Sequence, residues 1–162
     1  RLFEPYFIEP SSVGFSSYVI GFDHHRNAIR TFKIERLRAV VSTLEPYTIP
    51  DSFDPYQKLG SAWGVNWGDG GTPVEVVLRF VPGRVTERVR EAQWHPSQKI
   101  EVQPDGSSIF RVEVGSTLDM KWWIRQWGPD CVVLAPPELR REIGEELRQA
   151  AQLYAEFGQE AR

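Results

Sequence analysis

The sequence is poor in the residues on which most catalytic and metal sites depend. Its 162 residues include one cysteine, one methionine and three histidines. A single cysteine excludes an internal disulfide, and the apolar run C-V-V-L-A that begins at Cys131 predicts a buried, unreactive thiol. Cys-x-x-Cys, His-Glu-x-x-His, Gly-x-Ser-x-Gly and Walker sequences are all absent. We therefore predict neither an enzyme nor a metal or cofactor site.

Long apolar runs are also missing. No stretch of 18 apolar residues occurs, and the chain does not start with a charged and then apolar segment. We expect no membrane span and no signal peptide, and a cytoplasmic location in which the cysteine stays reduced. The 41% hydrophobic and 25% charged residues are ordinary for a globular protein. Because the sequence begins at Arg1 and not at methionine, we expect a longer parent protein.

Basic side chains are concentrated between residues 23 and 38, although the whole chain carries a net charge of -3. This stretch holds five Lys or Arg and two histidines against two acids. Alternate residues of a strand face opposite sides, so Lys33, between Phe32 and Ile34, predicts one apolar and one cationic face. We call residues 16–38 the basic hairpin and predict that it holds an anion. The alternative is a solvated strand face with surface salt bridges.

The three histidines have simpler interpretations than a metal site. His24 and His25 are adjacent, and adjacent side chains of an extended chain point to opposite sides. With Asp23 they are predicted to form a polar turn or to contact the anion, in preference to binding a metal. His95, between Trp94 and Pro96, is predicted to be a structural cap or a packed ring.

The first 45 residues read as short strands broken by Pro, Gly and Asn, which predicts a small curled antiparallel sheet. The expected strands are Tyr6 to Ile8, Tyr18 to Phe22, Ile29 to Ile34 and Leu37 to Thr43. Residues 46–73 have the composition of a linker, yet they contain five aromatic residues, so we expect this linker to pack down. Its Gly-rich end, Gly68 to Pro73, is predicted to be a turn, since no Gly-Lys-Ser/Thr follows as in a phosphate loop.

The second half alternates strands and helices in the order βαββαβ, which is typical of a ferredoxin-like domain, with one helix appended. Trp123 and Trp127 fall on the apolar stripe of a helix and are predicted to pack, whereas Trp122 lies off the stripe and suits an interface. The expected elements are strands 74–80, 99–103, 108–114 and 131–135, and helices 86–93, 118–126 and one opened by Pro137.

Several motifs carry a family resemblance. Y-V-I-G-F-D at 18–23 and R-T-F-K-I-E-R-L at 30–37 resemble the signature of the WYL domain of bacterial transcription regulators, after a start at residues 1–5 that resembles its R-x-x-x-P. Ser17 stands where the eponymous Trp is usual. Four later segments resemble the C-terminal extension called WCX, which usually follows a WYL domain. They are W-H-P-S-Q at 94–98, D-G-S at 105–107, W-G at 127–128 and A-P-P-E-L-R at 135–140.

The resemblance implies an α+β fold in three parts. A small Sm-like antiparallel β-barrel would occupy 1–45, a packed linker 46–73, and a ferredoxin-like WCX domain with a C-terminal helix 74–162. The barrel's usual first strand would precede Arg1, so we expect an open four-stranded sheet or one completed by a neighbouring molecule. Carried onto matching positions, the ligand contacts would be Tyr18, His24, Arg26, Arg30, Lys33 and Arg36.

The function implied is that of a ligand-sensing and dimerisation region. An anionic ligand, a single-stranded oligonucleotide or a nucleotide, would bind the basic hairpin and control DNA binding by an upstream helix-turn-helix domain. The WCX half would supply a homodimer interface, and no membrane partner is expected. An alternative is an assembly module that binds only protein, and a weaker one is a nucleotide-processing enzyme.

Overall fold

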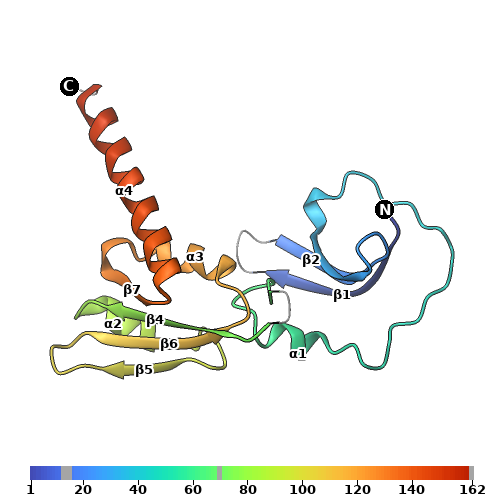
Figure 1. Ribbon diagram of the computed structural model, residues 1–162, viewed down its shortest axis with the longest axis horizontal. Helices are drawn as coiled ribbons and strands as arrows, with labels where there is room; N and C mark the ends of the chain where they lie inside the picture. Colours follow the sequence, from blue (N-terminus) through green and yellow to red (C-terminus); the bar gives the residue numbers. More distant parts are fainter. Residues whose placement is uncertain (12–15, 69–70, 161–162) are drawn as a thin grey trace.

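The computed structural model contains two antiparallel sheets joined by a long connection, and it describes residues 1–11, 16–68 and 71–160 (Figure 1). The first sheet has the order β1-β2-β3, and a 3-10 turn, η2, follows it directly. Its elements are β1 (Phe3–Ser11), β2 (Ser16–Asp23), β3 (Ala28–Lys33) and η2 (Ile34–Arg36). The basic hairpin, residues 16–38, therefore consists of β2, β3 and the turn between them, as predicted, followed by η2 and two further residues.

The predicted fourth strand, Leu37 to Thr43, is wrong. The chain turns at η2 instead of pairing with the free edge of β3, and residues 37–50 form a long exposed loop (Figure 1). Apolar side chains alone do not make a strand, because a strand also needs a neighbour for its backbone groups. Val40 and Leu44 are 79% and 90% exposed. Within the described residues the first half is thus an open sheet of three strands, and it does not close into a barrel.

The glycine of the Y-V-I-G-F-D motif is required by the close crossing of β1 and β2. The pairing of these strands shifts register between Pro5 and Phe7, which brings the backbone of Glu4 against Gly21. A Cβ at Gly21 would lie 1.9 Å from the Glu4 carbonyl oxygen and 2.8 Å from the Phe3 ring. Only glycine fits at this position.

The aspartate of the same motif closes the far end of the hairpin. Asp23 is fully buried, and its Oδ2 lies 3.2 Å from Nη1 of Arg1. The Arg1 guanidinium also lies 5.2 Å from the centre of the Phe32 ring. Oδ1 of Asp23 accepts a hydrogen bond from the His25 backbone N–H at 3.0 Å, within the turn predicted for this position. The start at residues 1–5 and the motif at 18–23, two of the segments that carry the family resemblance, are therefore joined by an ion pair.

The second half has the predicted order of elements and a sheet in the order β5-β6-β4-β7, with every neighbouring pair antiparallel. The helix predicted over 86–93 is observed over 84–90. Just after it, the backbone N–H groups of Trp94 and His95 donate to Gln98 Oε1, so residues 94–95 do not continue the helix. The elements are β4 (Val74–Phe80), α2 (Arg84–Arg90), β5 (Lys99–Val102), β6 (Ser108–Val114), α3 (Leu118–Arg125), β7 (Cys131–Ala135) and α4 (Pro137–Glu160).

One aromatic cluster dominates the core of this half. Trp123 contacts the rings of Trp63, Trp94, Phe110 and Trp127 at centroid distances of 4.8 to 5.5 Å. The predicted packing of Trp123 and Trp127 is confirmed, and Trp122 is exposed. Two further predictions hold: His95 is a buried ring stacked on Trp63, and burial raises the pKa of Cys131 to about 12.

The linker of residues 46–73, which we call the connection, packs against the first sheet, as predicted. Tyr47 and Phe53 contact the ring of Tyr6, and Tyr56 contacts Phe7, so the connection is held against β1. It also contains an unpredicted helix, α1 (Pro55–Leu59), whose first two free backbone N–H groups are capped by the Asp54 carboxylate. Part of the Gly-rich turn predicted at its end, residues 69–70, lies outside the described residues.

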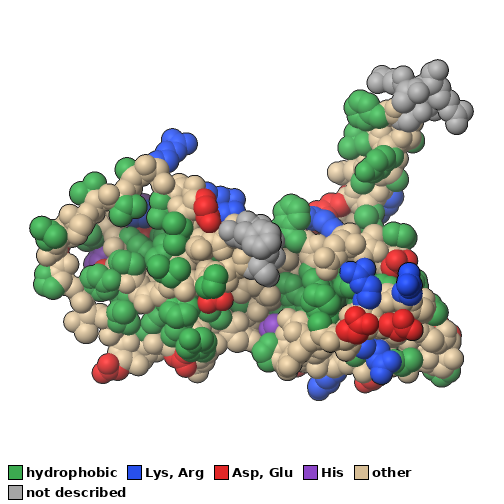
Figure 2. Space-filling model, turned by 180° about the vertical axis from the view of Figure 1, so that it is seen from behind, with side chains coloured by type: hydrophobic (Ala, Val, Ile, Leu, Met, Phe, Trp, Pro, Cys, Tyr) green, Lys and Arg blue, Asp and Glu red, His purple; other side chains and the backbone are tan. Residues whose placement is uncertain are grey.

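Helix α4 begins in the core and then runs off the body of the protein (Figure 1). Leu139 and Ile143 are buried, and ion pairs of Lys121 with Glu142 and of Arg125 with Glu146 fix the helix to α3. Further along, hydrophobic side chains stand exposed on the projecting part (Figure 2), and Tyr154 is 84% exposed. Among the described residues, no helix is both long and apolar enough to cross a membrane.

Candidate functional site: a cavity between the two sheets

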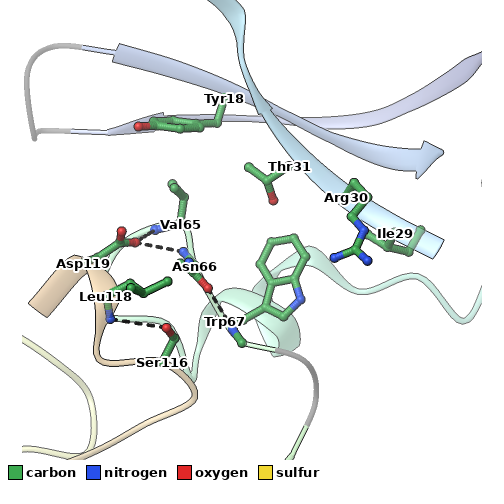
Figure 3. Close-up of a pocket in the computed structure, with 11 residues that line it drawn as sticks. Tyr18, Ile29, Arg30, Thr31, Val65, Asn66, Trp67, Ser116, Leu118 and Asp119 are labelled. Carbon is green, nitrogen blue, oxygen red and sulfur yellow. Dashed lines mark hydrogen bonds between the residues drawn. The ribbon is translucent and has the colours of Figure 1, made fainter. Parts of the chain in front are cut away.

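A cavity of about 450 Å³ lies where the first sheet, the connection and the start of α3 meet (Figure 3). This volume is within the range of small-ligand sites. Its walls come from both halves of the chain and combine aromatic, hydroxyl, amide and guanidinium groups. The lining residues are Tyr18, Ile29, Arg30 and Thr31 from the hairpin, Val65, Asn66, Trp67 and Gly68 from the connection, and Ser116, Leu118 and Asp119 from the second half.

The strand register explains the hairpin wall. Tyr18 pairs with Lys33, and Ile20 pairs with Thr31, so Tyr18, Thr31 and Lys33 share one face of the sheet. Arg30 pairs with Gly21 and belongs to the other face by register. It is exposed at the edge of the sheet and nevertheless lines the cavity (Figure 3). Alternation therefore places Lys33 on the face expected to hold cations, and Arg30 on the opposite face with Phe32.

The opposite wall is held by one carboxylate. Asp119, in the first turn of α3, accepts hydrogen bonds through Oδ2 from the backbone N–H groups of Val65 and Asn66, both at 2.9 Å (Figure 3). The Asn66 side chain in turn accepts from the Gly68 N–H at 3.1 Å. These bonds fix residues 65–68 to the second half of the protein. We call this set of bonds the Asp119 clamp.

A close backbone contact completes the Asp119 clamp. Gly68 and Gly115 face each other, and a Cβ on Gly115 would lie 2.3 Å from the Trp67 carbonyl oxygen. Gly68 itself has a φ of 76°, a conformation that favours glycine. The Gly115 N–H donates to the Ser61 carbonyl at 2.7 Å. Residues 65–68 of the connection are therefore fixed to the second half of the protein. The cavity lies between this wall and the wall formed by the first sheet, and each wall is held by its own contacts.

The six residues predicted as ligand contacts do not all meet. Tyr18 and Arg30 line the cavity, and Lys33 lies on the Tyr18 face beside it. Arg26 is exposed in the turn after β2, and Arg36 is exposed in η2.

His24 is engaged elsewhere. Its Nε2 lies 2.8 Å from Oε1 of Glu4, and this hydrogen bond is the main reason that the pKa of Glu4 is below its usual value. On the same hairpin, the carboxylate of Glu35 accepts from the Ser17 backbone N–H, which lowers the pKa of Glu35. The Glu4 carboxylate thus engages His24, and the Glu35 carboxylate engages the backbone of β2.

Sequence reasoning missed the whole second wall. Asn66, Trp67 and Asp119 carry no motif, and the strand and helix patterns do not show that positions about 50 residues apart meet. The usable signal was the aromatic content of the linker, which predicted packing but not a site. Within the described residues, no group of three or more His, Cys, Asp or Glu is placed to hold a metal ion. The cavity offers an aromatic surface, hydroxyls, one guanidinium and the Asp119 carboxylate, whose Oδ2 already accepts two backbone N–H bonds. With the anionic group placed at the guanidinium, this combination suits a ligand with a ring and an anionic group.

Comparison with known families identifies both halves. The WYL domain family matches residues 1–42, and the WCX domain family matches residues 72–151. The protein named PafB from Mycobacterium leprae (strain TN) is 29% identical over 132 residues, which cover 78% of this chain and 37% of that protein. The chain thus spans well under half the length of this relative.

Two solved structures are also similar. A crystal structure of a CRISPR Cas-related protein matches 95% of this chain and 43% of its own length, with a TM-score of 0.55 and 14% identity, which is a likeness of fold. Proteasome accessory factor B/C (PafBC) of Arthrobacter aurescens matches 85% of this chain and 20% of its own, with a TM-score of 0.40 and 20% identity.

Proposed function

The chain carries a WYL domain followed by a WCX domain, and we propose that together they form the ligand-sensing and dimerisation region of a bacterial transcription regulator. The ligand would be an anionic nucleic-acid or nucleotide-type molecule in the cavity between the two domains. An upstream helix-turn-helix domain of the parent protein would bind DNA. The free, buried Cys131 is compatible with the cytoplasm in which such a regulator would act.

One observation carries this proposal: the cavity has one wall from each domain. Tyr18, Arg30 and Thr31 stand on the first sheet, whereas Asn66, Trp67 and Asp119 are fixed to the second half by the Asp119 clamp. A ligand that contacts both walls favours one relative pose of the two domains. Differential affinity for two poses is what allosteric control requires, because a ligand can shift an equilibrium only by the difference in its binding free energies.

We also propose the domain boundaries 1–45, 46–73 and 74–162. Residues 1–45 would correspond to an incomplete Sm-like barrel, 46–73 to the linker and 74–162 to the WCX domain. The sheet order β5-β6-β4-β7 supports a ferredoxin-like second domain. His24, Arg26, Lys33 and Arg36 lie outside the cavity, and we propose them as contacts only for a strand long enough to extend over the hairpin.

The alternative, an assembly module, is favoured by the exposed apolar side chains on two segments. Val40, Val41 and Leu44 stand out on the loop after η2, and Tyr154 and Phe157 stand out on α4. Patches of this kind mark protein contacts. The two functions are compatible, since α4 can mediate a homodimer while the cavity binds the ligand.

Fluorescence polarisation with a labelled short single-stranded oligonucleotide tests the proposal. We expect the wild-type protein to bind with an affinity that falls steeply with added salt, as counterions are released. Arg30→Ala should weaken binding and make the salt dependence shallower by about 0.7 in log–log slope, the value for one phosphate contact on a single strand. Arg90→Ala, which removes an exposed arginine of α2 outside the cavity, is the matched control and should change neither. Absence of binding, or equal binding by Arg30→Ala, contradicts the proposal.

A further inference from the structure

Trp67 differs from the other five tryptophans of the chain. Trp63, Trp94, Trp123 and Trp127 pack ring against ring in the core of the second half. Trp122 lies on the surface, with the Arg125 guanidinium 4.9 Å from its ring centre. Trp67 has neither a ring partner nor a cation partner among the described residues, and it lines the cavity. A half-buried indole without an aromatic partner in a cavity wall is available to a ligand.

The backbone that carries this indole is held firmly. The residues on both sides of Trp67 take part in the Asp119 clamp, since Asn66 N–H donates to Asp119 and Gly68 N–H donates to the Asn66 side chain. The Trp67 carbonyl packs against Gly115 at a distance that leaves no room for a side chain there. The backbone that carries the ring is therefore preorganised, and binding need not pay again for ordering it.

The groups across from the indole define the ligand. Trp67 points from the connection toward β3, where Thr31 and Arg30 stand, and Tyr18 lies further along the same wall (Figure 3). Arg30 can bond a phosphate bidentately, and aromatic faces accept any base by stacking. The carboxylate of Asp119 also lines the cavity, but Oδ2 is occupied by two backbone N–H groups. The phosphate end of a ligand is thus favoured at Arg30 and the ring end at Trp67.

We propose that Trp67 is the base-stacking surface of this site, so that the ligand class is a nucleotide or a short single-stranded nucleic acid with one base on the indole and one phosphate at Arg30. This inference rests on the proposed function and adds to it a residue outside both family matches, which cover 1–42 and 72–151. Because Trp67 is fixed to the WCX half and Arg30 to the WYL half, a single nucleotide would connect the two domains.

The test compares two probes with equal phosphate charge: a short oligothymidylate and an abasic strand of the same length. Wild-type protein should prefer the strand with bases by roughly 5- to 150-fold, the range for stacking of one base. Trp67→Ala should lower affinity for oligothymidylate by that factor and abolish the preference, whereas Trp67→Phe should keep most of it. Trp122→Ala is the matched control and should behave as wild type. Arg30→Ala should weaken both strands alike and preserve the preference.

The outcomes separate the two proposals. Failure of the wild-type protein to bind either strand overturns both. If wild type prefers bases and Trp67→Ala keeps that preference, the stacking role is overturned while the ligand-sensing proposal stands on the Arg30→Ala result. An equal loss of affinity for both strands in Trp67→Ala also overturns stacking, because it shows that Trp67 only positions the wall. Thermal unfolding of each variant shows whether the loss is local.

Discussion

Removing the Asp119 carboxylate should release the second wall of the cavity while leaving the domain folded. Asp119 accepts two backbone N–H bonds at 2.9 Å, from Val65 and Asn66. A hydrogen bond to a charged group contributes about 1.5–3 kcal/mol, and these are half-buried, so the lower part of the range applies. Asp119→Ala should therefore ease local opening of residues 65–68 by about 3–4 kcal/mol for the two bonds together.

Amide hydrogen exchange reports this opening directly. The loss corresponds to a fall in protection of the Val65 and Asn66 amides by roughly 150- to 900-fold. Asp119→Asn keeps an acceptor oxygen without the charge and should lose about half of this free energy. Asp130→Ala, which removes an exposed carboxylate, is the matched control.

The amides of β4, in the centre of the second sheet, distinguish local from global change. They should keep wild-type protection in Asp119→Ala, because the aromatic core does not include Asp119. If the Val65 and Asn66 amides exchange as slowly in Asp119→Ala as in wild type, the Asp119 clamp does not hold the wall. If the β4 amides lose protection as well, the carboxylate stabilises the whole domain and the argument for a separately held wall is wrong.

Three further predictions concern stability and assembly. Burial keeps the pKa of His95 below its usual value, and His95 Nδ1 accepts from the Ser97 N–H, so the folded form favours the neutral ring. The stability that this ring contributes is complete above the unfolded pKa near 6.5 and is lost as pH falls below it. The melting temperature should therefore fall on acidification, and His95→Asn should flatten this dependence. Gly21→Ala should destabilise the first sheet by about 3 kcal/mol in urea unfolding, because the new Cβ would meet the Glu4 carbonyl oxygen. An unchanged unfolding midpoint would contradict the close crossing of β1 and β2. We expect a homodimer in light scattering at high micromolar concentration and a monomer when Tyr154 and Phe157 are both replaced by Ser; a monomeric wild type refutes the α4 interface.

The spacing of apolar residues predicted those helices and strands that bury one face of their own. The helical spacing of Trp123 and Trp127 identified core residues because an apolar stripe must be buried wherever the helix lies. The alternation in residues 18–22 and 108–114 identified strands for the same reason. The Leu37 to Thr43 strand failed because pairing depends on a neighbour that alternation does not reveal.

The site was harder to predict because it forms between segments distant in sequence. Tyr18 and Arg30 were predicted as ligand contacts from the family resemblance, and both line the cavity. Trp67 was counted only as a linker aromatic, since nothing local marks it as different from the packed Trp63. Its role depends on Asp119 and Gly115, which lie about 50 residues further along and hold its backbone. Charge composition likewise could not show that Glu4 bonds the His24 ring or that Glu35 bonds the Ser17 backbone N–H.

Photo-cross-linking tests most directly whether the ligand binds in the cavity between the two domains. A short single-stranded oligonucleotide that carries 5-iodouracil reacts with aromatic side chains on which the base stacks, and mass spectrometry of the digested product locates the modified residue. We predict that the cross-link lies on Trp67, with Tyr18 as the only secondary position, and that Arg30→Ala reduces its yield. Cross-links at exposed aromatics outside the cavity, such as Trp122 or Tyr154, with none at Trp67 or Tyr18, would contradict the account.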